Sequence, residues 1–187
     1  KEWFAAGKIG EITALRADFS NPFELDPTDR LFRADLSGGA LLDLGVYPIS
    51  FITAFLGYEP KQIISDVNVG HGVDMDEAVI FKYENAYASM TAGFDIENDN
   101  RAVIVGTEGR IAFDPWYFCT DTVRLYDKNN KLAEESITPH LCNGYEYEII
   151  EAQRCLVEGL KESTLNPLCD TVGVMKIMDR IRLDWNM

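Results

Sequence analysis

The chain has 187 residues, 47% hydrophobic and 26% charged, which are values of an ordinary globular domain and exclude a disordered chain. Its 31 acidic and 17 basic residues leave a net charge of -14, and a negative field repels phosphate backbones, so nucleic acid is disfavoured as a partner. The four cysteines form no CxxC pair, so we expect reduced thiols in a cytoplasmic protein, without a disulfide framework or a zinc site.

The longest apolar run, residues 44–58, is interrupted by Pro48, Ser50 and Thr53. It is too short to cross a bilayer, so we expect no membrane-spanning segment. The chain lacks an initiator methionine, and its first residues have the character of the middle of an element. We therefore interpret residues 1–187 as one domain of a longer protein.

The N-terminal part predicts a helix end, a strand and a long loop. Residues 3–6 have the character of a last helical turn, with Gly7 as its cap. A strand is predicted at residues 11–19. Residues 21–37 form a polar loop with two prolines, and a loop of this length is often functional.

The stretch GGALLDLGVY, residues 38–47, opens an apolar segment and places a carboxylate and a phenol in it. A helix over about residues 39–56 puts Asp43 and Tyr47 four residues apart on one face. The two glycines before it permit close approach by another backbone or by a ligand. Pro48 removes one backbone donor, which predicts a kink or a break.

Two interpretations of Asp43 and Tyr47 stay open at this point. A phenol near a carboxylate can donate or relay a proton. Alternatively, this is a core helix in which Asp43 bonds locally and Tyr47 is a buried ring with a satisfied hydroxyl. Spacing alone favours the structural interpretation, because catalytic pairs are rarer than structural ones.

The loop before the glycines carries Arg30, Phe32 and Arg33. Arginines at this place are able to bind an anionic or polyhydroxyl ligand. The alternative is that both are surface residues paired with Asp29 and Asp35. The residues alone leave both interpretations open.

After residue 60 the hydrophobic period changes to two, which predicts strands. They are expected at residues 61–69, 76–83, 86–94, 101–106, 110–113, 123–126 and 131–137. Short turns between them indicate an antiparallel meander. Residues 74–77, DMDE, lack the spacing of a calcium loop and are interpreted as the solvated beginning of a strand. An exposed apolar sheet face is expected to carry Ala88, Met90, Ala92 and Phe94.

Trp116, Tyr117 and Phe118 form an aromatic cluster after an Asp-Pro pair. The cluster either lines a ligand pocket or an interface, or packs in the core. His140 and Cys142 are two potential metal ligands, but two ligands in a loop are a weak signal, and no metal site is predicted.

Two helices are predicted to finish the chain. Asn143 and Glu146 fit a capping box for the first, and Asp170 is the expected N-cap of the second. The apolar face of the second helix comprises Val174, Ile177, Met178, Ile181 and Trp185. The predicted fold class is α+β, an open and mostly antiparallel sheet with helices packed on one face.

Several stretches resemble the C-terminal domain of the Gfo/Idh/MocA oxidoreductases. They are GKIGEI at 7–12, GGALLDLGVY at 38–47, YEI at 147–149, ES at 162–163 and MDRIR at 178–182. Tyr47, where many members carry histidine, is similar to the dihydrodiol dehydrogenase and glucose-fructose oxidoreductase branch. The resemblance spans nearly the whole chain, and its central stretch is the most specific part.

The resemblance implies the C-terminal fold of dihydrodipicolinate reductase-like proteins, in a protein whose N-terminal Rossmann domain binds NAD or NADP. In that setting Tyr47 gives or takes the hydroxyl proton and Asp43 orients or tunes the site. Gly39 and Tyr47 are the candidate cofactor contacts.

Arg33, Phe32 and Trp116 are the candidate substrate contacts. The chain carries neither the Rossmann domain nor the family's Glu-Lys-Pro lysine, and no GxGxxG or GxxxxGK[ST] turn is present. We therefore expect the isolated chain to bind no cofactor tightly and to be inactive.

Two functions remain open. The first is the substrate-binding and oligomerisation domain of an NAD(P)-dependent oxidoreductase acting on a sugar, polyol or dihydrodiol. The second is a non-catalytic ligand-binding or assembly module with the same fold. The expected partners are a small-molecule substrate and further copies of the chain, a dimer or higher homo-oligomer paired through the open sheet face as the resemblance implies.

Overall fold

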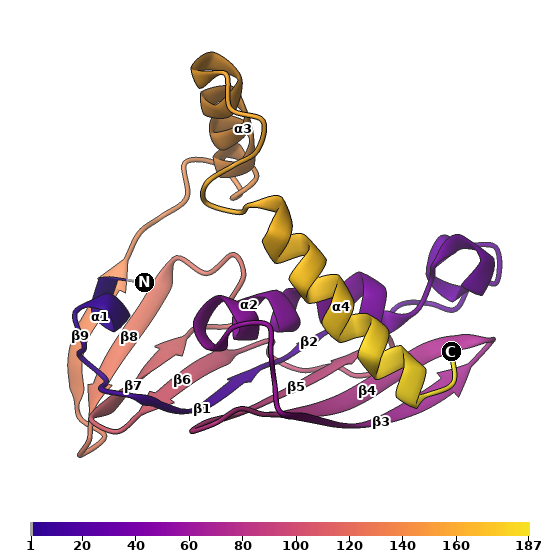
Figure 1. Cartoon of the computed structure of the whole chain (residues 1–187), viewed down its shortest axis with the longest axis horizontal. Coiled ribbons are helices and arrows are strands. Elements are labelled where there is room, and N and C mark those ends of the chain that lie inside the picture. The colour runs from indigo at the N-terminus through magenta and orange to yellow at the C-terminus, as the bar shows by residue number, and fades with distance from the viewer. Residues whose placement is uncertain (1) are drawn as a thin grey trace.

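The computed structural model describes residues 2–187 and shows a broad open sheet with helices over one face (Figure 1). The strands are β1 (Ile12–Ala17), β2 (Phe19–Ser20), β3 (Gln62–Gly70), β4 (Val73–Lys82), β5 (Tyr87–Gly93), β6 (Ala102–Gly106), β7 (Gly109–Phe113), β8 (Thr122–Asp127) and β9 (Leu132–Ile137). The helices are α1 (Glu2–Ala5), α2 (Val46–Leu56), α3 (Glu146–Glu158) and α4 (Leu168–Asp184). The predicted α+β class is confirmed.

Two short 3-10 turns, Arg30–Phe32 and Ala34–Leu36, interrupt the predicted long loop. A π-helical turn, Leu41–Gly45, follows them and runs directly into α2. We call Leu41–Gly45 the wide turn. The predicted helix over residues 39–56 is therefore present, but its first part is wider than an α-helix.

The position of β1 departs from the predicted meander. The strand order is β3-β4-β5-β1-β6-β7-β8-β9, with β2 paired to β5 beside this path. β1 runs parallel to β5 and antiparallel to β6, and β2 is also parallel to β5. The sheet is thus mostly antiparallel, with its first strand inserted in the middle.

The core lies between the sheet and the helices α2 and α4. Ile49 and Ile52 of α2 are fully buried. α4 buries Val174, Ile177, Met178 and Ile181, as the sequence predicts. Trp185 follows on the same side and donates its indole N–H to the Ser65 hydroxyl at 2.9 Å. Asp170 is not the cap, because the helix already begins at Leu168 after Pro167.

The predicted exposure of one β5 face is wrong. Its four apolar residues are at most 1% exposed and belong to the core; they are Ala88, Met90, Ala92 and Phe94. The alternation along β5 is as predicted, but a period of two does not say which face the helices cover.

The predicted solvated beginning of a strand at residues 74–77 is also wrong. β4 starts at Val73, and its pairing with β3 shifts between Asn68 and Val69, so that Met75 has no direct partner in the register. A bulge of this kind re-aims neighbouring side chains. Here it turns Asp74 toward the core, whereas Glu77 is buried because it alternates with Val79 and Phe81 on the core face of β4; both acidic residues are 2% exposed.

α3 stands away from the sheet (Figure 1) and, although described in full, has no buried residue. Of its predicted capping box only the glutamate half is present, because the helix begins at Glu146 after Tyr145 and the Asn143 side chain accepts the Tyr145 N–H at 3.3 Å instead of the Glu146 N–H. The Glu146 carboxylate accepts backbone N–H bonds from Cys142, Asn143 and Gly144 at 2.8, 3.1 and 2.7 Å. Burial raises the pKa of Glu146, but these bonds outweigh it and bring the pKa to about 2.

The helical segment Ala34–Leu56 is apolar and long enough to cross a membrane by composition. Half of its most apolar window is buried inside the structure, and a core helix of a folded domain passes the same test. The packing of α2 on the sheet accounts for this segment as part of the core.

Candidate active site

The two glycines before the wide turn each face a close neighbour. A Cβ on Gly38 would lie 2.4 Å from the Arg30 carbonyl oxygen. Gly39 has φ of 113°, and a Cβ there would lie 2.2 Å from Asp74 Oδ1. Another backbone therefore approaches Gly38, as expected, and a carboxylate approaches Gly39. The cofactor contact assigned to Gly39 stays a prediction.

Asp74 anchors the start of the helix. Its Oδ2 accepts the Leu41 N–H at 2.6 Å, which satisfies one of the donors left free at a helix start. Burial raises the pKa of Asp74, and the bond to Leu41 works against that rise. The carboxylate thus holds the wide turn against β4.

Pro48 explains why a wider turn suits this place. It lacks an N–H and, in a regular α-helix, its ring would clash with the Leu44 carbonyl. The wide turn lies immediately upstream and includes Leu44. The break predicted at Pro48 is therefore found as a π-helical turn, a feature often seen at functional sites.

Asp43 lies in the wide turn and forms an ion pair with Arg30. Arg30 belongs to a 3-10 turn capped by Asp29, whose Oδ1 accepts the Leu31 N–H at 2.9 Å. The Asp43 side chain is 23% exposed, so the pair sits at the edge of the core. The loop thus supplies a cation to the predicted site through Arg30.

Tyr47 is 45% exposed, which rules out the buried-ring interpretation. Its ring packs edge-on against Phe19 at 5.0 Å between centroids and lies 5.2 Å from Phe118. Phe19 and Phe118 are 4.4 Å apart, and Trp116 lies 6.1 Å from Phe19. We call Phe19, Trp116 and Phe118 the aromatic platform.

The phenol of Tyr47 lies in a field that keeps it protonated. Burial raises its pKa most, followed by Tyr145, Asp43 and Glu148. Within residues 2–187, every group that shifts this pKa raises it. A phenol acts as a base near neutral pH only when a positive charge lies close to it. The phenol is therefore protonated near neutral pH, and its role as a proton donor stays a prediction.

Of the other predicted site residues, Trp116 is exposed and Phe32 is buried. Trp116 is 44% exposed and belongs to the aromatic platform, while Tyr117 beside it is buried and packs on Phe51. The candidate substrate contact at Phe32 is corrected. Phe32 is 4% exposed and packs edge-on against Phe94, so its ring belongs to the core.

Arg33 binds Asp35 through both side-chain oxygens, at 3.0 and 2.6 Å. This matches the surface pairing that the sequence left open. The arginine that meets the predicted site is Arg30 instead. The sequence analysis did not predict Phe19 and Phe118 as partners of Tyr47. Phe19 lies on β2 and Phe118 in the loop between β7 and β8, and no local pattern relates either of them to Tyr47.

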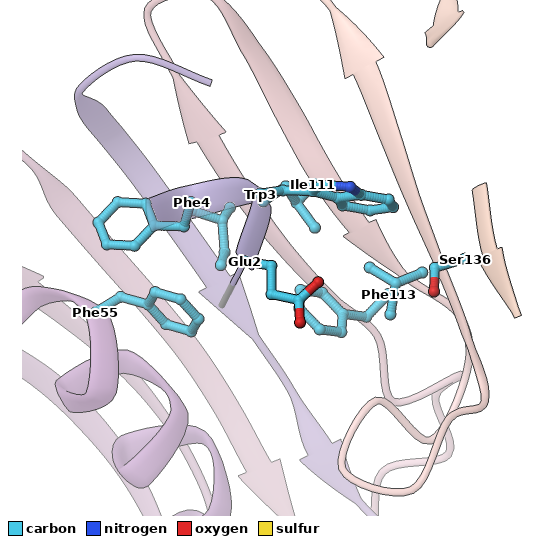
Figure 2. A pocket seen from close by; sticks show the side chains of 9 residues that line it. Glu2, Trp3, Phe4, Phe55, Ile111, Phe113 and Ser136 are labelled. Carbon is cyan, nitrogen blue, oxygen red and sulfur yellow. The ribbon is translucent and has the colours of Figure 1, made fainter. Parts of the chain in front are cut away.

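The cavities do not coincide with Tyr47. One of about 390 Å³ lies between α1, Phe55 at the end of α2, and strands β6 to β9, and the Glu2 carboxylate lies among its apolar walls (Figure 2). A second, of about 560 Å³, lies between α2 and α4 and includes Val46 and Ser50 near Tyr47. Neither of these two cavities is lined by Tyr47, so Tyr47 is a candidate because of its chemical group and its neighbours.

A family model described as the GFO/IDH/MocA C-terminal domain matches residues 1–112. Among curated proteins, a trans-1,2-dihydrobenzene-1,2-diol dehydrogenase of Danio rerio is 34% identical over 183 residues, which cover 93% of this chain and 54% of that protein. The chain therefore spans about half the length of the curated relatives it matches.

Solved structures share the fold. KijD10, a 3-ketoreductase from Actinomadura kijaniata in complex with NADP and TDP-benzene, superposes with a TM-score of 0.81 at 23% identity, over 97% of this chain and 56% of that chain. Levoglucosan dehydrogenase, in complex with NADH and levoglucosan, gives 0.74 at 22% identity, over 92% and 55%. With the family model covering more than half of its residues, the chain belongs to the GFO/IDH/MocA C-terminal domain family.

Proposed function

We propose that this chain is the substrate-binding domain of an NAD(P)-dependent oxidoreductase that acts on a hydroxyl or carbonyl group of a sugar, polyol or dihydrodiol. The observation that carries the proposal is the half-exposed phenol of Tyr47, four residues from Asp43 and set beside the aromatic platform. The names of the similar dehydrogenases support this choice of reaction and substrate class.

Each part of the proposed site has its own role. Trp116 and Phe118 of the aromatic platform, which are exposed, pack on the apolar face of a ring-shaped substrate, and the buried Phe19 ring supports them. The Tyr47 hydroxyl holds a proton, which it gives to the substrate oxygen on reduction and recovers on oxidation. The Asp43–Arg30 ion pair holds the wide turn in place, and the wide turn continues directly into α2, which carries Tyr47. NAD(P), when bound, supplies or accepts the hydride.

We propose that the glycine pair and the start of the helix do not form a cradle for the dinucleotide. The space beside Gly38 is occupied by the Arg30 carbonyl, and the space beside Gly39 by the Asp74 carboxylate. A pyrophosphate needs open backbone N–H groups at a helix start, and here Asp74 takes the Leu41 N–H. We therefore propose that a separate domain of the same protein holds the cofactor.

The isolated chain is expected to show no saturable binding of NADH or NADPH at micromolar concentrations. Titration followed by nicotinamide fluorescence measures this, with lactate dehydrogenase as the positive control for NADH. Micromolar affinity would show that the chain carries a cofactor site that its backbone does not display.

A screen of the full-length protein against sugars, polyols and diols, followed by the absorbance of reduced nicotinamide, tests the proposed function. Turnover with any of these classes supports it. A protein that binds such a ligand without turnover would instead be the non-catalytic module, the second function considered above.

We also propose that the chain self-associates through the open face of the sheet. Ile64 and Ile80 are direct partners on β3 and β4 and are 53% and 47% exposed, and Tyr87 on β5 is 55% exposed. An exposed apolar patch on a broad sheet often marks an interface.

The four free thiols agree with a reducing compartment, and we propose the cytoplasm.

Ile80→Asp is expected to shift the chain from dimer or higher oligomer to monomer, because it places a charge in the middle of this patch. Light scattering coupled to size-exclusion chromatography measures the mass. Leu156→Asp on α3, at a residue 80% exposed and away from the sheet, is the control and should keep the native assembly. A native chain that stays monomeric at all concentrations contradicts the proposal.

A further inference from the structure

Two carboxyl groups of β4 lie beneath the two ends of the wide turn. Asp74 meets its beginning, through the Leu41 N–H and the space at Gly39. Glu77 meets its end, since Oε1 lies 3.1 Å from the place a Cβ on Gly45 would take. Gly45 is the residue midway between Asp43 and Tyr47. Glu77 therefore supports the segment that carries both candidate catalytic groups.

Glu77 differs from Asp74 in having nothing to bind. It is 2% exposed, and among residues 2–187 neither of its side-chain oxygens has a hydrogen-bond partner. An ionised carboxylate in such a place pays a large desolvation cost without compensation, whereas a neutral acid pays much less. The geometry alone therefore favours the protonated form.

The charges around Glu77 act in the same direction. On β4 itself, Asp74 and Asp76 repel a negative charge at this place. Above the wide turn, Arg30 is already paired with Asp43. Burial, followed by Asp74 and Asp76, raises the pKa of Glu77 well above its usual range. The Arg182 guanidinium of α4 acts on Asp74 of the same strand, whose pKa it lowers.

We propose that Glu77 is a positioning residue, which keeps a proton at neutral pH and thereby lets the wide turn rest on β4 with Asp43 and Tyr47 in place. Loss of that proton puts an unpaired charge under Gly45, and the turn must lift or admit water to hydrate it. The movement carries Tyr47 with it, because Gly45 precedes Tyr47 by half a helical turn. The catalytic meaning of this movement rests on the proposed function, but the movement itself does not.

Carbon-13 NMR of the chain, labelled at glutamate Cδ and tyrosine Cζ, tests the proposal without any activity assay. Glu77→Gln and Tyr47→Phe assign the two resonances. We expect Glu77 to titrate well above the exposed glutamates. The Tyr47 Cζ resonance should shift with the same midpoint, before the phenol itself ionises.

In Glu77→Gln, which keeps the shape and removes the ionisation, the early shift of Tyr47 should disappear and the later phenol titration should remain. Glu84→Gln, at an exposed glutamate, is the matched control and should leave both steps unchanged. The proposal is overturned if the wild-type Glu77 titrates together with the exposed glutamates, or if Tyr47 does not respond to it. Both outcomes are decided on the wild-type chain, so a poorly folded variant does not obscure them.

Because these resonances are read on the chain alone, their result is independent of whether the full-length protein reduces or oxidises anything. An inactive full-length protein would count against the proposed function. A normal Glu77 titration would count against the positioning role.

Discussion

Tyr47→Phe is expected to lower kcat of the full-length oxidoreductase by about 10²–10⁴-fold, the usual contribution of a general acid or base. The substitution removes only the hydroxyl, so the ring keeps its contacts with Phe19 and Phe118. Folding and KM should change little. Steady-state kinetics with the substrate found in the screen, together with thermal unfolding of the variant, separate a loss of chemistry from a loss of structure.

Tyr126→Phe is the matched control, because Tyr126 lies on β8, where its ring packs under the Arg110 guanidinium and outside the aromatic platform. It should keep wild-type kcat. Asp43→Asn should lower kcat less than Tyr47→Phe, because it alters the ion pair with Arg30 rather than the reacting proton. A Tyr47→Phe enzyme with near wild-type kcat would make Tyr47 a surface aromatic without a catalytic role.

Gly39→Ala is expected to destabilise the chain by roughly 2–6 kcal/mol. Backbone strain for a residue forced to φ near 113° costs about 1–3 kcal/mol. The added Cβ would also lie 2.2 Å from Asp74 Oδ1, and displacing that carboxylate breaks its bond to Leu41, worth about 1–3 kcal/mol for a buried group. Urea unfolding of the isolated chain measures the free energy.

Gly7→Ala provides the comparison. Gly7 has φ of 69°, and among the described residues a Cβ there meets no atom within 4 Å. Only left-handed strain of about 1–2 kcal/mol is expected at this position. If Gly39→Ala lowers the free energy of unfolding by no more than Gly7→Ala does, the contact between Gly39 and Asp74 does not contribute to stability. In the double variant with Asp74→Ala, the two costs should not add, because both act on the same bond.

The sequence by itself determined which segments are helices and which are strands, and hence the fold class. These features follow from local periods, caps and turns, as in the β8–β9 hairpin and the Glu146 carboxylate that accepts backbone N–H groups at the start of α3. The sequence also placed Asp43 and Tyr47 on one segment, since their spacing is local. The GGALLDLGVY stretch pointed to the family that the comparison then showed.

Only the tertiary structure decided where β1 lies, which face of β5 the helices cover, and which arginine meets Asp43. Each of these depends on contacts between segments far apart in the chain, which no local period encodes. The same holds for Glu77. A single-residue bulge in β4 turns Asp74 toward the core, and the helices cover the face of β4 that carries Glu77, so two acidic residues that look solvated in the sequence lie buried beneath the wide turn.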